Sequence, residues 1–378
     1  MKKTIISLII IILLVAMVFF VWQKTDLGKL SKTNKNEKSI NTITMVTDVG
    51  GLGDQGFNDA GWRGIQMASK AFNFKPDVIE SQLGDSLYEN VIKATEASDV
   101  IFGMGFMIKD AIAKAALIYP EAHFVLIDAD AGVDTNVASY IFYSGQSGYL
   151  AGIIAASVSN NNKIGVVEGM AIPPVGAWMT GFKAGVKTWN QAENDHVVVM
   201  TEIAGEFTNS EKGEALTNFL MDKDCDIVVN VAGGTGIGVY KAIKEANAKL
   251  GISSEEIKSG AKNPKYFSVG TDMDYSEVYP DILVAALKQI PNVIISSVKD
   301  IQEGKFKGGI HYVGYPEKAT DISDMKYTKK YVPKKALELV EKARKLMDNR
   351  NEKLSFPIDV IDSDTFMNTF EVPKELLD

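Results

Sequence analysis

The chain has 378 residues, of which 46% are hydrophobic and 23% charged, the composition of an ordinary globular protein. Its net charge of −8 at pH 7 argues against a nucleic-acid binder, which carries a basic surface. A single cysteine, Cys225, excludes an intrachain disulfide and is expected to be a small buried hydrophobe. The 3 histidines lie far apart and form no zinc spacing. At roughly 100–200 residues per domain, two lobes are expected.

Residues 5–22 form an apolar run without a charge, preceded by Lys2 and Lys3. The run is close to the roughly 18–20 residues that span a bilayer, and the lysines are typical of a cytoplasmic N-terminus. We interpret residues 1–22 as an uncleaved membrane anchor, with a cleaved signal segment as the alternative. Either one places the rest of the chain on the extracytoplasmic side of the cell membrane. Residues 23–41 lack apolar periodicity, and this pattern predicts a flexible tether.

From residue 42 onward, predicted strands and helices alternate. The strands are near-continuous apolar runs, as expected where helices cover both faces of a parallel sheet. Strands are predicted over 42–49, 75–80, 100–103, 123–127 and 137–142, and helices over 62–72, 87–97 and 109–118.

After Ser147 the same α/β pattern begins again. Helices are predicted over 148–159, 181–190, 210–222, 236–248, 290–304 and 334–349, and strands over 163–167, 197–203, 226–231, 266–269, 284–288 and 309–313. Repetition of one unit indicates two similar lobes rather than one large sheet. We assign 42–145 and 289–306 to the N-terminal lobe, and 146–288 and 307–378 to the C-terminal lobe.

A polar, Gly-rich loop separates the first strand from the first helix. It carries the carboxylates of Asp48 and Asp54, the ring of Phe57 and the amide of Asn58. Open α/β sheets bind ligands beyond the carboxyl ends of their strands, where this loop lies. These side chains are the groups that stack a flat ring and hold hydroxyls or ring nitrogens.

The same loop also allows a different interpretation. Gly51, Gly53 and Gly56 match the G-x-G-x-x-G dinucleotide fingerprint, and Glu80 lies roughly where the ribose-binding acid is expected. An NAD-dependent enzyme is therefore one alternative. Against this alternative, Asp48 and Asp54 place two negative charges beside the loop that would have to receive the negatively charged pyrophosphate. A turn without any ligand is the simplest alternative.

Polar or aromatic groups recur where other predicted strands end. They include Phe106, Asp128, Trp178, Phe207, Gly233, Gly234 and Asp272. Trp178 and Phe207 lie in Gly/Pro-punctuated connections rather than in helix stripes. We find no Ser/His/Asp or Cys/His arrangement, no Walker loop and no metal-ligand spacing, so we expect no catalytic residue, no metal and no cofactor.

Five stretches, 48–58, 181–186, 205–208, 231–240 and 269–272, together resemble the basic membrane protein family. This family contains the Med- and purine-nucleoside-receptor-like substrate-binding components of nucleoside ABC importers. The likeness covers 42 to about 349. It implies a type I periplasmic-binding fold, with two Rossmann-like lobes, three crossovers and a ligand in the cleft between the lobes.

The resemblance also implies roles for individual residues. Phe57 and Phe207 match the two aromatic residues that sandwich the base, and Asp128 matches a carboxylate that reads the base edge. Asp48 and Asn58 match residues that line the first-lobe wall of the cleft. The residues that match the family's ribose site are Gly233, Gly234, Asp272 and Lys288. Phe106 and Trp178 match further cleft positions.

The chain departs from the family pattern in two places. It has no lipid-accepting cysteine, and Gly56 stands where members often have a polar side chain. The expected function is that of an extracytoplasmic binding component, with purine nucleosides preferred, that serves an ABC permease and ATPase as a monomer. A sugar or signal-molecule receptor of the same fold is the alternative among binding proteins.

Overall fold

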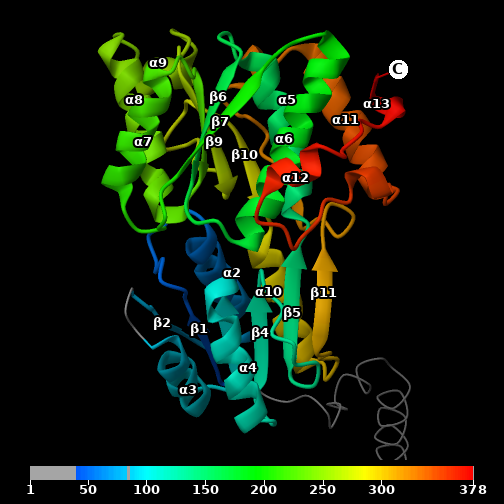
Figure 1. The fold of residues 1–378 in the computed structure, drawn as a ribbon. Coiled ribbons are helices and arrows are strands. Elements are labelled where there is room, and N and C mark those ends of the chain that lie inside the picture. The colour runs from blue at the N-terminus through cyan, green and yellow to red at the C-terminus, as the bar shows by residue number, and fades with distance from the viewer. Residues whose placement is uncertain (1–39, 83–85, 378) are drawn as a thin grey trace, which may run out of the picture.

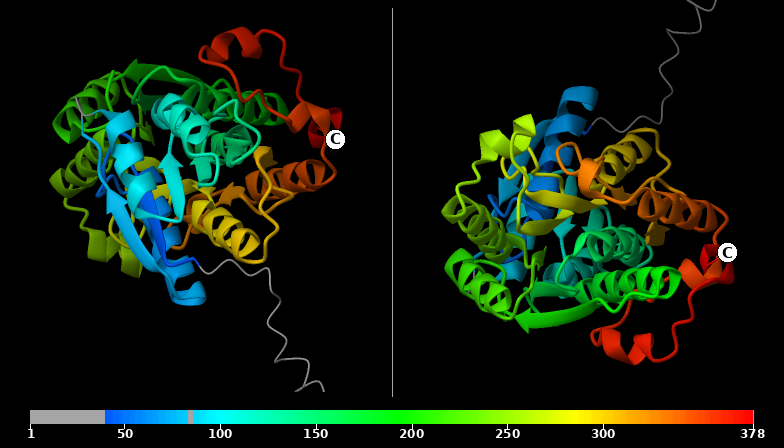
Figure 2. Two further views of the ribbon diagram at one scale, coloured as in Figure 1. Left: turned by 90° about the horizontal axis from the view of Figure 1, so that it is seen from below. Right: turned by 90° about the horizontal axis from the view of Figure 1, so that it is seen from above.

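The computed structural model describes residues 40–82 and 86–377. The apolar run over 5–22 and most of the expected tether lie outside the described residues. Two lobes are stacked one above the other, and each is built on a six-stranded sheet (Figure 1). Viewed along the axis through both lobes, helices lie on both sides of the strands (Figure 2). The expected α/β fold of two similar lobes is confirmed.

The first sheet has the strand order β11-β5-β4-β3-β1-β2, and every neighbouring pair is parallel. Its strands are β1 (Thr42–Val46), β2 (Lys75–Ile79), β3 (Val100–Met104), β4 (His123–Ile127), β5 (Val137–Phe142) and β11 (Gly309–Val313). The central strands β3 and β4 are buried almost throughout, which explains their continuous apolar sequences.

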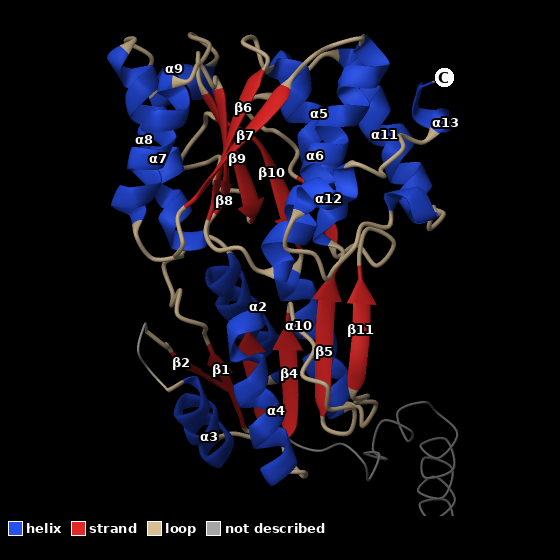
Figure 3. Ribbon diagram, viewed as in Figure 1, coloured by secondary structure: helices blue, strands red, loops and turns tan. Residues whose placement is uncertain are grey.

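The second sheet repeats this arrangement with the order β12-β10-β9-β8-β6-β7. Its strands are β6 (Lys163–Glu168), β7 (Val198–Ile203), β8 (Ile227–Val231), β9 (Phe267–Asp272), β10 (Ile282–Lys288) and β12 (Thr320–Ile322). Only β12 is antiparallel to its neighbour. In Figure 3 the strands of the two sheets point toward each other, so the carboxyl ends of both sheets meet between the lobes.

Helices cover the sheets. The first lobe carries α2 (Phe57–Phe72), α3 (Leu87–Ala97), α4 (Lys109–Ile118) and α10 (Ile290–Gln302). The second carries α5 (Ser144–Val158), α6 (Pro173–Glu193), α7 (Ser210–Asp222), α8 (Ile237–Lys249), α9 (Ser254–Ser259) and α11 (Lys334–Asp348), followed by the short α12 (Ser363–Met367) and α13 (Lys374–Leu377). The 3-10 turns are η2 (Phe106–Ile108), η3 (Gly233–Gly236), η4 (Lys329–Tyr331) and η5 (Glu352–Leu354).

The chain passes between the lobes three times, from β5 to α5, from β10 to α10 and from β11 to β12. The expected boundary at residue 307 is wrong for the last passage. Strand β11 pairs with β5 of the first sheet, so residues 309–313 belong to the N-terminal lobe. Pairing with β5 occurs across a long sequence separation, which local periodicity does not reveal.

Several element limits differ from the sequence-based prediction. Strand β1 ends at Val46, and α2 already begins at Phe57. Helix α6 begins at Pro173, so Trp178 lies inside a helix. The prediction that Trp178 lies in a connection is therefore wrong. Proline is tolerated in the first turn of a helix because its missing N–H would have no partner there. Strand β12, with 3 residues, was not predicted.

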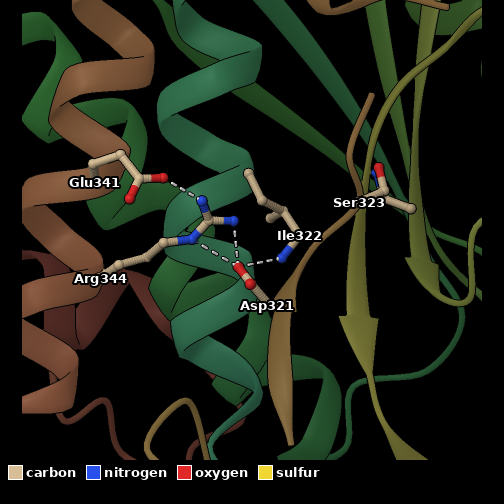
Figure 4. Close-up of polar contacts among 6 residues, drawn as sticks. Asp321, Ile322, Ser323, Glu341 and Arg344 are labelled. Carbon is tan, nitrogen blue, oxygen red and sulfur yellow. Dashed lines mark hydrogen bonds and ion pairs between the residues drawn. The ribbon is translucent and has the colours of Figure 1, made fainter. Parts of the chain in front are cut away.

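The C-terminal part of the chain is fixed to the second lobe. Arg344 of α11 donates to Asp321 of β12 through Nε at 3.0 Å and Nη2 at 2.6 Å, and also pairs with Glu341 (Figure 4). Further on, Phe356 and Phe370 pack around Tyr149 of α5. The tail is therefore part of the second lobe and not a separate domain.

Candidate functional site

One cavity lies where the carboxyl ends of the two sheets meet. It encloses about 720 Å³ of space free of atoms, counting the solvent at its mouth. All the site residues predicted from the sequence line it: Asp48, Phe57, Asn58, Phe106, Asp128, Trp178, Phe207, Gly233, Gly234, Asp272 and Lys288. The lining residues outside that set are Gly50, Asp54, Gly105, Ile172, Pro174, Val175, Val231 and Thr271. Of these, Asp54 is one of the two carboxylates noted in the first loop, but the family resemblance gave it no role in the ligand site.

Asp54 organises the first-lobe wall of the cavity. Its Oδ1 accepts from the backbone N–H of Gly56 at 3.0 Å and of Asp59 at 3.1 Å, and its Oδ2 accepts from that of Asn58 at 2.8 Å. The first N–H groups of a helix have no partner within the helix, so this carboxylate lets α2 begin at Phe57. Burial raises the pKa of Asp54 to about 7, although the hydrogen bonds from Asn58 and Asp59 act to lower it.

The same wall holds Asp48 and Asn58 together. Asp48 Oδ1 accepts from Asn58 Nδ2 at 3.0 Å and from the Gly50 N–H at 2.9 Å. Burial raises the pKa of Asp48, and these two hydrogen bonds oppose the rise. Gly105 (φ +90°) passes close by: a Cβ there would lie 2.9 Å from Asp48 Oδ2 and 3.4 Å from the Phe57 ring. Only glycine therefore suits this close approach.

The loop does not form the phosphate cradle of a dinucleotide site. The N–H groups at the start of α2, which would receive a pyrophosphate, are occupied by the Asp54 carboxylate. Glu80 is used in the loop itself, where its Oε2 accepts from the Leu52 N–H at 2.9 Å. The G-x-G-x-x-G match is explained by turn geometry, with Gly51 (φ +60°) and Gly53 (φ +84°) in the left-handed region.

The second-lobe wall presents Phe207 and Trp178. Phe207 lies in the connection between β7 and α7, as predicted, and its carbonyl oxygen accepts from the Thr235 N–H of η3 at 3.0 Å. This bond joins the Phe207 connection to the Gly-rich turn that follows β8. Trp178 is 3% exposed and stacks on Phe182 at 5.2 Å with an interplanar angle of 14°. Its ring is therefore held by the core of the second lobe.

A buried ion pair lies in the lining of the cavity. Lys288 Nζ is bonded to Asp128 Oδ2 and lies 3.8 Å from Asp272 Oδ1. The side chains of Lys288 and Asp128 are only 8% and 6% exposed. Burial acts to lower the pKa of Lys288, but Asp128 and Asp272 outweigh it and leave the pKa raised. Burial raises the pKa of Asp272, and the nearby Lys288 opposes this rise.

Contacts across the cavity show that the lobes are closed on each other. Met273, which follows β9 of the second lobe, packs against the hydrophobic core of the first lobe. Asp128 and Lys288 join the two lobes through their ion pair. The site is therefore formed between both lobes, which contact each other beside it.

Among residues 40–82 and 86–377, no group of His, Cys, Asp and Glu side chains is arranged to hold a metal ion. Within the same ranges no helix has the length and apolar character needed to cross a bilayer.

Two α/β lobes with a cavity lined by the strand ends of both define the type I periplasmic-binding fold, which an ABC transporter solute-binding protein of Aeropyrum pernix K1 shares. The family model described as "Bmp: ABC transporter substrate-binding protein PnrA-like" matches residues 41–360, and the chain belongs to this family. The resemblance to basic membrane proteins is thereby confirmed. The family consists of ABC substrate-binding proteins, which are not enzymes, so the NAD-dependent alternative is wrong.

Individual relatives agree with this assignment. The chain is 29% identical over 272 residues to the ABC transporter nucleoside-binding protein BmpA of Lactococcus lactis, covering 68% of this chain and 74% of that protein. It is 26% identical to basic membrane protein D of Borreliella burgdorferi, covering 69% of this chain and 72% of that protein.

Solved structures show the same fold. An ABC transporter solute-binding protein of Aeropyrum pernix K1 superimposes with a TM-score of 0.75 and 26% identity, covering 89% of this chain and 98% of that chain. A transcriptional activator of the comK gene from Bacillus halodurans gives a TM-score of 0.63 at 21% identity, over 82% of this chain and 97% of that one, and supports the fold alone.

Proposed function

We propose that this substrate-binding protein takes up a nucleoside, preferentially a purine nucleoside, in the closed cavity and delivers it to an ABC permease. The observation that carries the proposal is the presence of two aromatic residues, Phe57 and Phe207, in one cavity on opposite lobes. A flat base stacks on aromatic rings by its faces, which a sugar alone does not require on both sides. The name of the Lactococcus lactis relative, a nucleoside-binding protein, agrees with this ligand class.

The charges of the cavity favour a ligand without phosphate. Four carboxylates line it, those of Asp48, Asp54, Asp128 and Asp272, against the one lysine Lys288. Lys288 is already bonded to Asp128, so no free cation in this lining remains to pair with a phosphate. A neutral nucleoside avoids the repulsion that a nucleotide would meet. We assign Asp272 and the Gly233–Gly234 turn to the ribose hydroxyls, which are good partners for charged and backbone groups.

Closure explains how binding is passed on to the transporter. The ligand enters between separated lobes, and closure of the lobes buries it. Closure also joins the surfaces of the two lobes into one surface that the transporter can recognise. Membership in the family implies an ABC permease and ATPase as partners. We expect the protein to act as a monomer.

We further propose that the apolar run over residues 5–22 anchors the protein in the cell membrane, with the cavity on the extracytoplasmic side. Relatives in Pyrococcus horikoshii and Pyrococcus abyssi are named lipoproteins, which supports a membrane-attached protein. Intact-mass measurement on protein extracted from membranes tests this. A mature chain that begins after Trp22, or one that carries an acyl group, would refute an uncleaved anchor.

Titration calorimetry on the chain from residue 42 tests the ligand class, with adenosine, guanosine, inosine and ribose as ligands. Tighter binding of the nucleosides than of ribose supports the proposal, whereas ribose bound as tightly as the nucleosides would indicate a sugar receptor. Mass spectrometry of small molecules released by denaturing freshly purified protein provides an independent identification.

A further inference from the structure

The ion pair in the lining of the cavity joins the two lobes at a crossover. Lys288 is the last residue of β10, and the chain passes from it through Gln289 into α10 of the first lobe. Its partner Asp128 directly follows β4 of the first lobe. The pair thus joins residues of different lobes, whereas Asp272, which ends β9 beside β10, lies in the same sheet as Lys288.

The two aspartates hold equivalent places in the two lobes. Strand β4 lies third from the β11 end of the first sheet, and β9 lies third from the β12 end of the second. Asp128 (φ +65°) and Asp272 (φ +64°) both adopt the left-handed conformation, which is uncommon for residues other than glycine. One lysine thus faces a matching carboxylate from each lobe.

The surroundings leave Lys288 few other partners in the closed state. Its Nζ lies 5.5 Å from the Phe57 ring centroid and 6.0 Å from that of Phe142, both on the first-lobe side. With the lobes apart, water can solvate Lys288 and Asp128 separately. With the lobes together, each charge is buried and depends on the other, and removing one partner would leave an uncompensated buried charge.

We propose that Lys288 is a positioning residue that holds Asp128 across the cleft, so that this pair maintains the closed state and slows release of the ligand. The role in ligand release rests on the proposed function, whereas the role in closure does not.

The test compares Lys288→Met with Lys299→Met. Methionine keeps much of the length of lysine without its charge, and Lys299 is a 58% exposed residue of α10, which makes it the matched control. Small-angle X-ray scattering without ligand should show a larger radius of gyration for Lys288→Met and no change for Lys299→Met. Stopped-flow release of adenosine, guanosine and inosine should be faster by on the order of tenfold or more in Lys288→Met, because a buried charge has lost its partner.

Asp128→Asn is the second variant, in case Lys288→Met does not fold. It should speed release of all three nucleosides by one common factor and open the free protein. A changed ranking of the three nucleosides would assign Asp128 to the base edge and overturn the proposal. Unchanged scattering and release rates in folded variants would also overturn it. If no nucleoside binds the wild type, the proposed function fails, and the scattering comparison still decides whether the pair maintains closure.

Discussion

Gly234 of the second lobe lies against Asp54 of the first lobe. A Cβ added to Gly234 would come within 3.8 Å of the Asp54 Cα and 3.0 Å of the Phe207 carbonyl oxygen. The tight contact is within the second lobe, whereas a Cβ would meet Asp54 at ordinary van der Waals distance. Because that distance leaves no further room, the additional methyl groups of a larger side chain would press on the loop before α2.

Gly234→Val is expected to hinder closure and so to weaken nucleoside binding. Overpacking of this kind typically costs about 1–3 kcal/mol, which corresponds to roughly tenfold or more in affinity. Calorimetry measures the affinity. Ala248→Val, at an exposed position near the end of α8, is the control and should bind normally. Wild-type affinity in Gly234→Val would mean that the lobes approach less closely in the liganded protein.

Phe57→Ala should weaken adenosine, guanosine and inosine by a similar amount, because an aromatic face stacks on any base without reading its edge. The expected loss is on the order of 1–3 kcal/mol. Calorimetry with the three nucleosides checks it, with Phe219→Ala on α7, where Phe219 is 44% exposed, as control. A loss confined to one nucleoside would contradict stacking at this position.

Asp272→Ala should weaken every ribonucleoside and leave the free base adenine little affected, because we assign Asp272 to the sugar. A hydrogen bond to a charged group contributes roughly 1.5–3 kcal/mol. The comparison of adenosine with adenine, each titrated into wild type and variant, isolates the ribose contribution. Equal losses for adenosine and adenine would remove Asp272 from the ribose site.

Stability should depend on pH through Asp54. Burial raises the pKa of Asp54 to about 7 in the folded protein, whereas an aspartate in an unfolded chain titrates near about 3.9. Between these values the folded state binds a proton that the unfolded state does not. The free energy of unfolding therefore falls as pH rises through this window and levels off above about pH 7.

Asp54→Asn cannot titrate, so its free energy of unfolding should fall less between pH 5 and pH 7.5 than that of the wild type. Denaturant unfolding at the two pH values measures the difference. Asp281, whose pKa burial raises to about 6, contributes equally to both proteins and cancels. Asp77→Asn, at an exposed position on β2, should behave as the wild type does. Parallel pH profiles for Asp54→Asn and wild type would refute a raised pKa.

Much of this protein is determined by the local sequence. Apolar runs predicted β3 and β4 because strands covered on both faces need apolar residues at every position. Polar groups at strand ends predicted the lining of the cavity because the carboxyl ends of parallel strands share one edge of a sheet. The motifs between residues 48 and 272 were sufficient to identify the family.

Only the tertiary structure decided the remaining features. It placed β11 in the first lobe, because strand pairing depends on a partner that is remote in sequence. It also showed that the Asp54 carboxylate accepts from the first N–H groups of α2. The sequence could not decide this, because the same loop also matches a phosphate-binding motif. The bond between Lys288 and Asp128 joins residues 160 positions apart. No local pattern predicts it, because only the packing of the two lobes brings these two residues together.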